Sequence, residues 1–138
     1  QVEALRDLHR QACAHARRPR ADKSGSASDA PFAVYPRPDS AILCGDFNYP
    51  PEAAEHGRLQ APIDDTTPAW RDAWPLAHPG EPHAHTVGLH GADWPDHPYC
   101  CDFVCVSADL APRVRDVRVN RQTDASDHQP VLLELLDA

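Results

Sequence analysis

Polar and ionisable side chains interrupt short apolar runs of this sequence at three places. They are Gly45-Asp46-Phe47-Asn48 directly after the run at 41–44, Asp102 inside the run at 101–106, and Ser126-Asp127-His128 shortly before the run at 131–136. A carboxylate inside an apolar strand costs free energy unless it is paired, hydrogen-bonded or bound to a metal ion. Because three such places occur in one short chain, we expect them to meet at one edge of a sheet.

The side chains at these places would form a site of hard oxygen ligands with a single imidazole. Its candidate members are Asp46, Asn48, Asp102, Asp127 and His128. Carboxylate, amide and water ligands suit Mg²⁺ or Mn²⁺ better than zinc. A His held by a buried Asp is fixed in one tautomer and is poised for proton or charge chemistry. The plainer interpretation is that Gly45-Asp46 only ends a strand and that Asp127 only caps a turn.

Apolar strands must position these groups. The segment 40–44 is apolar on both faces and is bounded by turn residues, which predicts a central strand of a covered sheet. The segment 101–106 predicts a second apolar strand, and 131–136 closes the chain as another. Val117 and Val119 alternate with polar neighbours, which is typical of a half-exposed strand.

Three helices are predicted. The apolar residues Val2, Leu5, Leu8 and Ala12 recur at helical spacing in Gln1–Arg18, which predicts an amphipathic helix with one buried stripe. The histidines of this helix, His9 and His15, are expected on its surface. Prolines open a second short helix over 50–59. Thr67 followed by Pro68 predicts a third, running to Trp74.

The segments 20–38 and 75–98 are rich in Pro, Ser, Gly or His, and we expect both to be loops. Five histidines of the second loop have no ligand spacing on a regular element: His78, His83, His85, His90 and His97. This favours a solvated loop over a metal site, although some of them could line a substrate groove. We expect Trp70 and Trp74 to pack, because they lie four apart on the third helix. Trp94 is the better candidate for a substrate contact.

The composition is that of one globular domain, with 138 residues, 41% of them hydrophobic and 25% charged. The 13 basic and 21 acidic residues give a net charge of −8, which argues against a broad basic face for non-specific nucleic-acid binding. No apolar run approaches the ~20 residues of a transmembrane helix. The sequence has no Met and begins inside a predicted helix, so we expect it to be part of a longer polypeptide.

The cysteine pattern favours a reducing compartment, such as the cytoplasm. The five cysteines are an odd number, two of them are adjacent, and no CxxC pair occurs. A secreted disulfide scaffold and a structural zinc site built on cysteines therefore both lack support. Cys44, Cys101 and Cys105 lie in apolar runs, where a free Cys acts as a small hydrophobic residue. We expect these three to pack in the core.

The three polar segments together resemble a known superfamily. Ile42-Leu43-Cys44-Gly45-Asp46-Phe47-Asn48, Cys101-Asp102-Phe103-Val104-Cys105-Val106-Ser107 and Ser126-Asp127-His128-Gln129-Pro130-Val131 resemble the C-terminal half of the endonuclease/exonuclease/phosphatase superfamily, the DNase I-like phosphoesterases. The intervening stretch from Trp70-Arg71-Asp72 to Thr86 is similar too. The resemblance implies an α/β (α+β) fold, the C-terminal half of a four-layer α/β/β/α sandwich. It covers residues 1–138 as a partial domain.

The resemblance also implies a role for each matching residue. Asp46 would orient or activate the attacking water, and Asn48 would hydrogen-bond the scissile phosphate. Asp127, with Asp46, would hold Mg²⁺ or Mn²⁺. His128 would contact the phosphate and stabilise its developing charge, with Asp102 as its partner. Thr86 and Ser126 match positions close behind the site. These roles suit the residue types, because phosphoryl transfer depends on positioning and electrostatic stabilisation.

The resemblance implies hydrolysis of a phosphate ester: nucleic acid, a phospholipid head group or a small phosphodiester. Two features depart from the family. The Asn and the metal-binding Glu of the family's first half are absent from these residues, and Cys100-Cys101 replaces the usual Arg-hydrophobic pair before the strand Asp. We therefore expect this chain alone to be inactive or very feeble, and to self-associate through exposed sheet. The alternative is a non-catalytic relative that serves as a partner-binding module.

Overall fold

The fold combines helices with two antiparallel sheets. The computed structural model describes residues 1–17, 38–91 and 95–137, so most of the loop predicted over 20–38, and Trp94, lie outside the described residues. One sheet has three strands in the order β1-β3-β2, with β1 at Ile42–Asp46, β3 at Asp102–Ser107 and β2 at Trp70–Asp72. The other pairs β4 (Val114–Val119) with β5 (Val131–Leu135). The predicted mixed class of helix and sheet is confirmed.

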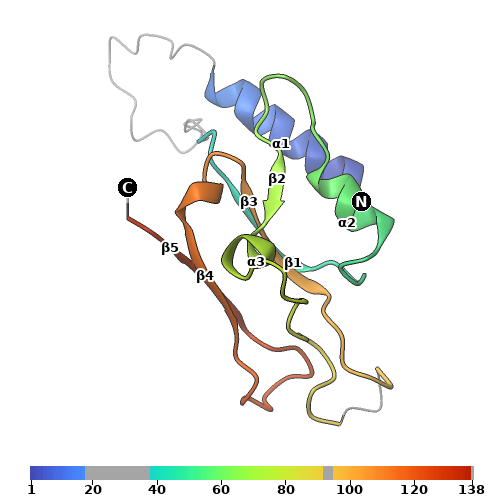
Figure 1. Ribbon diagram of the computed structural model, residues 1–138. Coiled ribbons are helices and arrows are strands. Elements are labelled where there is room, and N and C mark those ends of the chain that lie inside the picture. Colours follow the sequence, from blue (N-terminus) through green and yellow to red (C-terminus); the bar gives the residue numbers. More distant parts are fainter. Residues whose placement is uncertain (18–37, 92–94, 138) are drawn as a thin grey trace, which may run out of the picture.

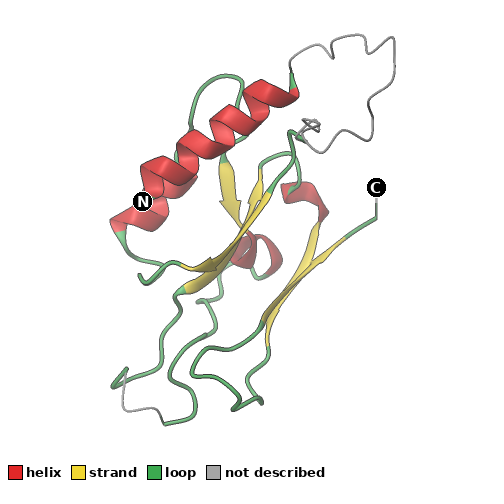
Figure 2. Ribbon diagram, turned by 180° about the vertical axis from the view of Figure 1, so that it is seen from behind, coloured by secondary structure: helices red, strands yellow, loops and turns green. Residues whose placement is uncertain are grey.

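The layers follow from which residues each sheet face buries. Helices α1 (Val2–Ala16) and α2 (Ala54–Gln60) lie on one side of the three-stranded sheet, and the β4–β5 pair and helix α3 (Ala73–Ala77) lie on the other (Figures 1 and 2). A core around Leu59 and Phe103 fills the helical side. A smaller core of Ala73, Val104 and Val117 joins the two sheets. A short 3₁₀ helix, η1 (Ala111–Arg113), leads into β4.

Strand β1 lies at the edge of its sheet, and the prediction that it is a covered central strand is wrong. The central strand is β3, which is buried along almost its whole length. Ile42 is 50% exposed, and Cys44, expected in the core, is exposed as well. The reason is that the second sheet has two strands among the described residues. Its core reaches Val104 of β3 and includes no described residue of β1.

The prediction of a helix from Thr67 to Trp74 is also wrong. Asp64 instead accepts hydrogen bonds from the backbone and hydroxyls of Thr66 and Thr67, which forms a turn. The chain then pairs with β3 as strand β2, so Trp70 and Trp74 lie on different elements. Helix α3 begins only at Ala73, where the Asp72 carboxylate accepts a hydrogen bond from the Trp74 amide at 3.0 Å.

Helix α1 buries the predicted stripe only in part: Val2 and Leu5 pack against the core, but Leu8 does not. Its buried residues are Arg6, His9 and Cys13, whereas Leu8 is 56% exposed. His9 was expected on the surface, but it is buried, and its Nε2–H donates a hydrogen bond to the Pro68 carbonyl at 2.8 Å. The stripe is rotated by about one residue because a buried arginine and histidine find partners on α2 and the following turn.

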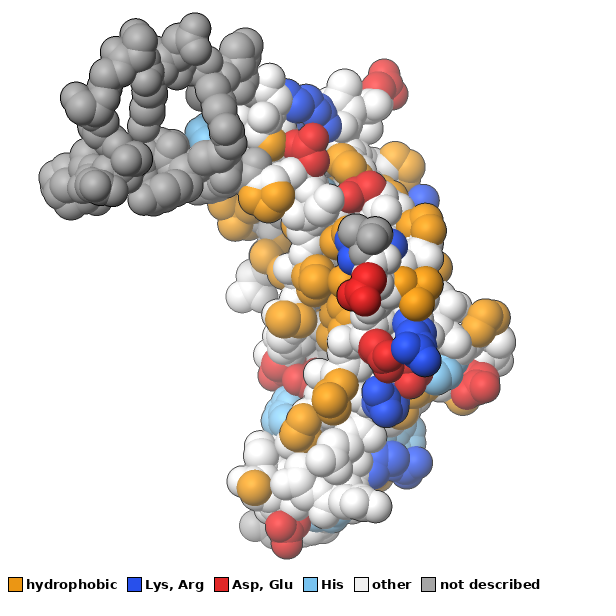
Figure 3. All heavy atoms as spheres, turned by 90° about the vertical axis from the view of Figure 1, so that its left-hand side faces the viewer, with side chains coloured by type: hydrophobic (Ala, Val, Ile, Leu, Met, Phe, Trp, Pro, Cys, Tyr) orange, Lys and Arg blue, Asp and Glu red, His pale blue; other side chains and the backbone are white. Residues whose placement is uncertain are grey.

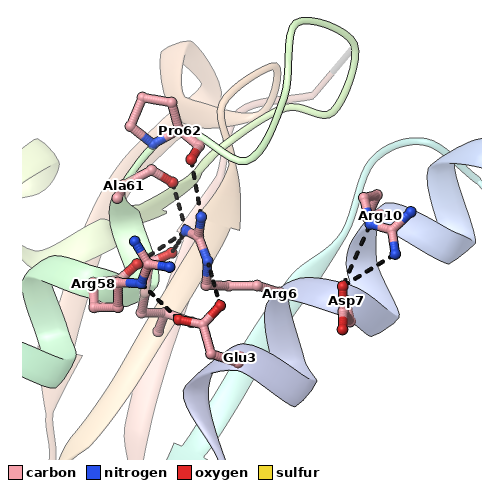
Figure 4. A network of polar contacts seen from close by, with 8 residues as sticks. Glu3, Arg6, Asp7, Arg10, Arg58, Ala61 and Pro62 are labelled. Carbon is pink, nitrogen blue, oxygen red and sulfur yellow. Dashed lines mark hydrogen bonds and ion pairs between the residues drawn. The ribbon is translucent and has the colours of Figure 1, made fainter.

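Arg6 fastens α1 to the C-terminal end of α2. Its guanidinium donates hydrogen bonds to the carbonyl oxygens of Arg58, Leu59, Ala61 and Pro62, at 2.9, 3.3, 2.6 and 2.9 Å (Figure 4). Arg58 and Leu59 lie in the last turn of α2, where carbonyls lack the full set of intrahelical donors, and Ala61 and Pro62 directly follow the helix. Glu3 contacts both Arg6 and Arg58. The helix predicted over 50–59 thus exists, although it begins later, at Ala54.

The outer face of the β4–β5 sheet mixes charged and apolar side chains. Arg115 and Arg118 both form ion pairs with Glu134, and Leu132 beside them is 52% exposed (Figure 3). Such a face is open to solvent in this structure. Among the described residues, no helix is both long and apolar enough to cross a lipid bilayer.

Candidate functional site

The end of β1 and the start of β3 bring two carboxylates together. Asp46 and Asp102 are register partners in the antiparallel ladder, so their side chains leave the sheet on the same face. Asp46 is exposed, and the side chain of Asp102 is only 17% exposed. One carboxylate therefore meets solvent while its neighbour needs partners inside the protein.

Asp102 finds those partners in His128 and Thr86. Its Oδ2 lies 2.9 Å from His128 Nδ1 and accepts a hydrogen bond from the Thr86 hydroxyl at 2.6 Å. The Thr86 oxygen in turn accepts from the backbone amides of Cys101 and Asp102, at 3.2 and 3.1 Å. The expected pairing of Asp102 with His128 is present. With Nδ1 on the carboxylate, His128 Nε2 is left facing away from it.

Two loops carry Thr86 and His128 to the same place. The Gln129 amide donates to the Thr86 carbonyl at 2.7 Å, and the Gly88 amide donates to the Asp127 carbonyl at 3.2 Å. Val87 forms isolated bridges with both Tyr99 and His128. The segment 86–88 thus links the loop before β3 to the loop before β5. It explains how residues far apart in sequence share one site.

The surrounding carboxylates raise the pKa of His128. The largest cause is the hydrogen bond with Asp102, and the negative charges of Asp102, Asp46 and Asp127 act in the same direction, while burial opposes them. The folded protein therefore holds a proton on this ring more strongly than an isolated histidine would.

Asn48 projects from a turn that follows β1. Its φ of 56° lies in the left-handed region, which Asn tolerates better than most residues. The backbone amide of Asn48 donates to Asp46 Oδ1 at 2.8 Å, and the backbone amide of Phe47 donates to the Cys101 carbonyl at 2.8 Å. Since the ring of Phe47 packs on the core, the turn is anchored while Asn48 itself stays exposed.

At this site, the group of ligand atoms that lie close together differs from the predicted set. Atoms of Cys101, Asp102 and His128 lie within 4.8 Å of one another, and Asp46 and Asp127 lie outside this group. Burial, together with the charges of Asp102 and Asp46, raises the pKa of Cys101 to about 12. That thiol is therefore protonated and a poor ligand. The exposed oxygens of Asp46 and Asp127 remain the better donors for a hard cation.

Ser126 organises the approach to His128. Its hydroxyl accepts a hydrogen bond from the His128 amide at 3.1 Å and lies 3.3 Å from Asp127 Oδ1. The polar triplet Ser126-Asp127-His128 is thus a short hydrogen-bonded turn on the exposed side of His128. Asp127 is exposed there.

A second polar cluster was not predicted, and a small cavity is lined both by its Asp72 and His83 and by Thr86 and Asp102 of the first site. His56 Nε2 and His83 Nε2 lie 2.8 and 2.6 Å from the same Asp72 oxygen, Oδ2. His78, from the same predicted solvated loop as His83, bonds the Val117 carbonyl at 2.8 Å. The solvated-loop prediction is therefore wrong for His78 and His83, whereas His85, His90 and His97 are exposed as expected. His78 and His83 turn inward because they form hydrogen bonds there with the Val117 carbonyl and the Asp72 carboxylate.

No protein-family model matches this sequence, and no curated protein is similar enough to it to count as a match. The case for a function therefore rests on the chain's own side chains.

Proposed function

We propose that the protein is a phosphoesterase of the DNase I-like class that depends on a divalent metal ion. The observation that carries this proposal is the Asp102–His128 pair, 2.9 Å apart, next to the register partner Asp46 at the end of β1. An imidazolium oriented by a carboxylate, with exposed carboxylates nearby, is the combination needed to hold a phosphate ester and a cation together.

The donor set fits Mg²⁺ or Mn²⁺. Asp46 and Asp127 are exposed carboxylates near His128, and the nearby thiol of Cys101 is kept protonated by burial. Hard oxygen donors suit these cations. In our proposal Asp127 and Asp46 would hold the metal ion, which would supply positive charge to the phosphate oxygens.

Each of the other side chains has a defined task in the proposed hydrolysis. Asp46 orients the water that attacks phosphorus, and the side-chain amide of Asn48 donates a hydrogen bond to a phosphate oxygen. His128, whose pKa is raised by its hydrogen bond with Asp102, stabilises in its protonated form the charge that develops as the ester oxygen leaves. Thr86 fixes Asp102 through its hydroxyl, and Ser126 fixes the His128 backbone. Such an arrangement lowers the barrier by positioning and electrostatics.

The substrate class proposed is a phosphate ester: nucleic acid, a phospholipid head group or a small phosphodiester. The net charge of −8 disfavours non-specific binding to duplex nucleic acid. We also propose that the layers form part of a four-layer sandwich. The order helices, sheet, sheet supports this, as does the bare face of β1, where a wider second sheet would pack.

The test is hydrolysis of a chromogenic phosphodiester and a phosphomonoester by the full-length protein, with and without Mg²⁺. We expect Mg²⁺-dependent turnover that falls by at least about 10²-fold in Asp127→Ala and His128→Ala. Asp96→Ala and His97→Ala are matched controls, because they remove an exposed Asp–His ion pair on a loop. Equal losses in both pairs of variants, or turnover unaffected by Asp127→Ala and His128→Ala, would contradict the proposal.

The open edge of β1 favours a second candidate, a partner-binding module of the same fold. An edge strand presents unpaired backbone groups to which another chain can add, and Ile42 and Cys44 are exposed on this one. Partner binding that survives His128→Ala, in a full-length protein without phosphoesterase activity, would favour this candidate.

We place the protein in a reducing compartment, the cytoplasm. All five cysteines are free thiols, and four of them are buried. Burial raises the pKa of Cys100 and Cys101 to about 12, which makes these thiols unreactive.

A further inference from the structure

The His56–Asp72–His83 cluster joins three separate elements in the interior. His56 comes from α2, Asp72 ends β2, and His83 lies in the loop that follows α3. Their side chains are 7%, 2% and 16% exposed. The two imidazole Nε2 atoms and Asp72 Oδ2 all lie within 4.8 Å of one another. Three ligand atoms therefore converge on one point that water hardly reaches.

The carboxylate is held so that a single oxygen faces the imidazoles. Asp72 Oδ1 accepts from the Trp74 amide at 3.0 Å, and the Asp72 amide donates to Gln60 Oε1 at 3.0 Å. Aromatic packing fixes the rings. The ring centroids of His56 and Phe103 are 4.4 Å apart, and His83 stacks on Trp74 with the centroids 5.9 Å apart. Ligands oriented by a second layer of contacts are characteristic of metal sites.

We propose that His56, Asp72 and His83 form a site for a transition-metal ion of the zinc type. Zinc binds imidazole nitrogen and carboxylate oxygen at about 2.0–2.2 Å, so neighbouring donors in a tetrahedral site lie roughly 3.3 Å apart. The observed separations of 2.8 and 2.6 Å need only a small widening. The two rings are nearly perpendicular, at 89°, as two donors on different corners of a tetrahedron can be.

Binding is an exchange of protons for the metal ion. To bind the metal ion through Nε2, a neutral imidazole that donates its Nε2 proton to Asp72 would move that proton to Nδ1, whereas an imidazolium would release its Nε2 proton and keep the one on Nδ1. In both cases the metal-bound ring is neutral. The buried carboxylate then has a dication as its partner, and the ion has two nitrogen ligands. A cavity of about 10 Å³ borders Asp72, His83 and Cys100. It has room for about one water as the fourth ligand.

The ligand chemistry separates this site from the proposed active site. Two imidazoles favour zinc, copper or nickel over Mg²⁺, whereas the exposed carboxylates at Asp46 and Asp127 favour Mg²⁺. His56 Nδ1 is buried without a hydrogen-bond partner in the described part of the chain. A zinc-binding imidazole usually donates from that nitrogen, so we expect micromolar rather than nanomolar affinity. The inference does not depend on the proposed phosphoesterase activity.

The experiment is a titration of the metal-free protein with Zn²⁺ against a chromophoric chelator. We expect one equivalent to bind, and the affinity to fall at least about tenfold in His83→Gln. His128→Gln is the matched control, because it alters the Cys101-Asp102-His128 group and should leave the zinc affinity of the His56-Asp72-His83 site unchanged. Unchanged zinc affinity in His83→Gln, or a loss only in His128→Gln, would overturn the inference.

A second measurement needs no substitution and so does not depend on whether a variant folds. Imidazole nitrogen NMR of the wild-type protein is recorded with and without one equivalent of Zn²⁺. The proposal requires the Nε2 resonances of His56 and His83 to shift strongly while those of His128 do not. Shifts confined to His128, or no shift at His56 and His83, would exclude the site.

Discussion

At the scale of single residues, the main feature is an imidazole whose charge is set by its neighbours. His128 lies beside Asp102 and within the fields of Asp46 and Asp127, and these groups raise its pKa. Since the folded state favours the protonated ring, this interaction stabilises the fold fully below the ordinary pKa of about 6.5. The contribution is lost as the pH rises through the raised value.

Asp102→Asn should therefore lower the pKa of His128, because it removes the hydrogen-bonded carboxylate that is the largest cause of the shift. NMR titration of the His128 ring would measure the change. Asp116→Asn is the control, since Asp116 contacts His78 and not His128. An unchanged His128 titration in Asp102→Asn would show that the pair does not set its charge.

Asp72 is a carboxylate with the opposite shift. Burial alone would raise its pKa, but hydrogen bonds from His56, His83 and the Trp74 amide outweigh burial and hold it at about 2. Because the folded value is depressed, the stabilisation is present above the ordinary value of 3.8 and is lost as the pH falls towards 2.

We expect the free energy of unfolding to fall by about 2 kcal/mol more in the wild type than in Asp72→Asn between pH 5 and pH 2, as denaturant titrations at each pH would show. Asp7→Asn, on the exposed face of α1, serves as the control and should follow the wild type. Parallel pH profiles for the wild type and Asp72→Asn would contradict this assignment.

The sequence predicted one of these two clusters and not the other. Asp102 was found because a carboxylate interrupts an apolar strand, and His128 because it stands just before another strand. His56, Asp72 and His83 carry no such local sign. They come from a helix, a strand end and a loop, and only the tertiary fold shows that they share one oxygen atom.

At the scale of elements, the attachment of α1 depends on one buried guanidinium. Arg6→Met should cost at least about 2 kcal/mol, because it removes the guanidinium that donates to the carbonyls of Ala61, Pro62 and the last turn of α2. Arg10→Met removes an exposed pair with Asp7 and should cost about 0.5 kcal/mol or less. Urea unfolding of both variants would measure the difference. Equal costs would show that the Arg6 contacts contribute no more than a surface ion pair.

The elements were predicted better in kind than in detail. Helix α1 and strand β4 were expected from periodicity, strands β3 and β5 from apolar runs, and helix α2 from the prolines that open it. The buried face of α1 was predicted only in part, because hydrophobic spacing cannot foresee that Arg6 and His9 will find buried carbonyl partners. The helix at Thr67 failed because the Asp64 turn and the pairing of β2 with β3 outweighed a local capping signal.

At the scale of the whole molecule, a two-stranded sheet packs on a three-stranded one and leaves β1 bare. Ile42 and Cys44 are exposed on the same face of β1, which pairs with β3 alone within the described ranges. Exposed apolar side chains on an unpaired strand edge favour association between chains. The sequence pattern of β1 resembles that of a covered strand, and only the width of the second sheet reveals that it is not covered.

We therefore expect the 138-residue chain to self-associate with rising concentration, and Ile42→Lys to suppress this, as sedimentation velocity would show. Leu8→Lys is the matched control, because Leu8 is a similarly exposed hydrophobic residue on α1. A wild type that stays monomeric across the concentration series, or equal suppression by both variants, would rule out association through β1.

The sharing of Asp72 has an evolutionary consequence. This carboxylate begins α3 through Oδ1 and receives both imidazoles through Oδ2, so replacing it alone would strand two buried rings and uncap a helix. Related chains should then change positions 56, 72 and 83 as a set or leave all three alone. Such correlated drift, visible in an alignment of homologues, would record the triad as one inherited unit.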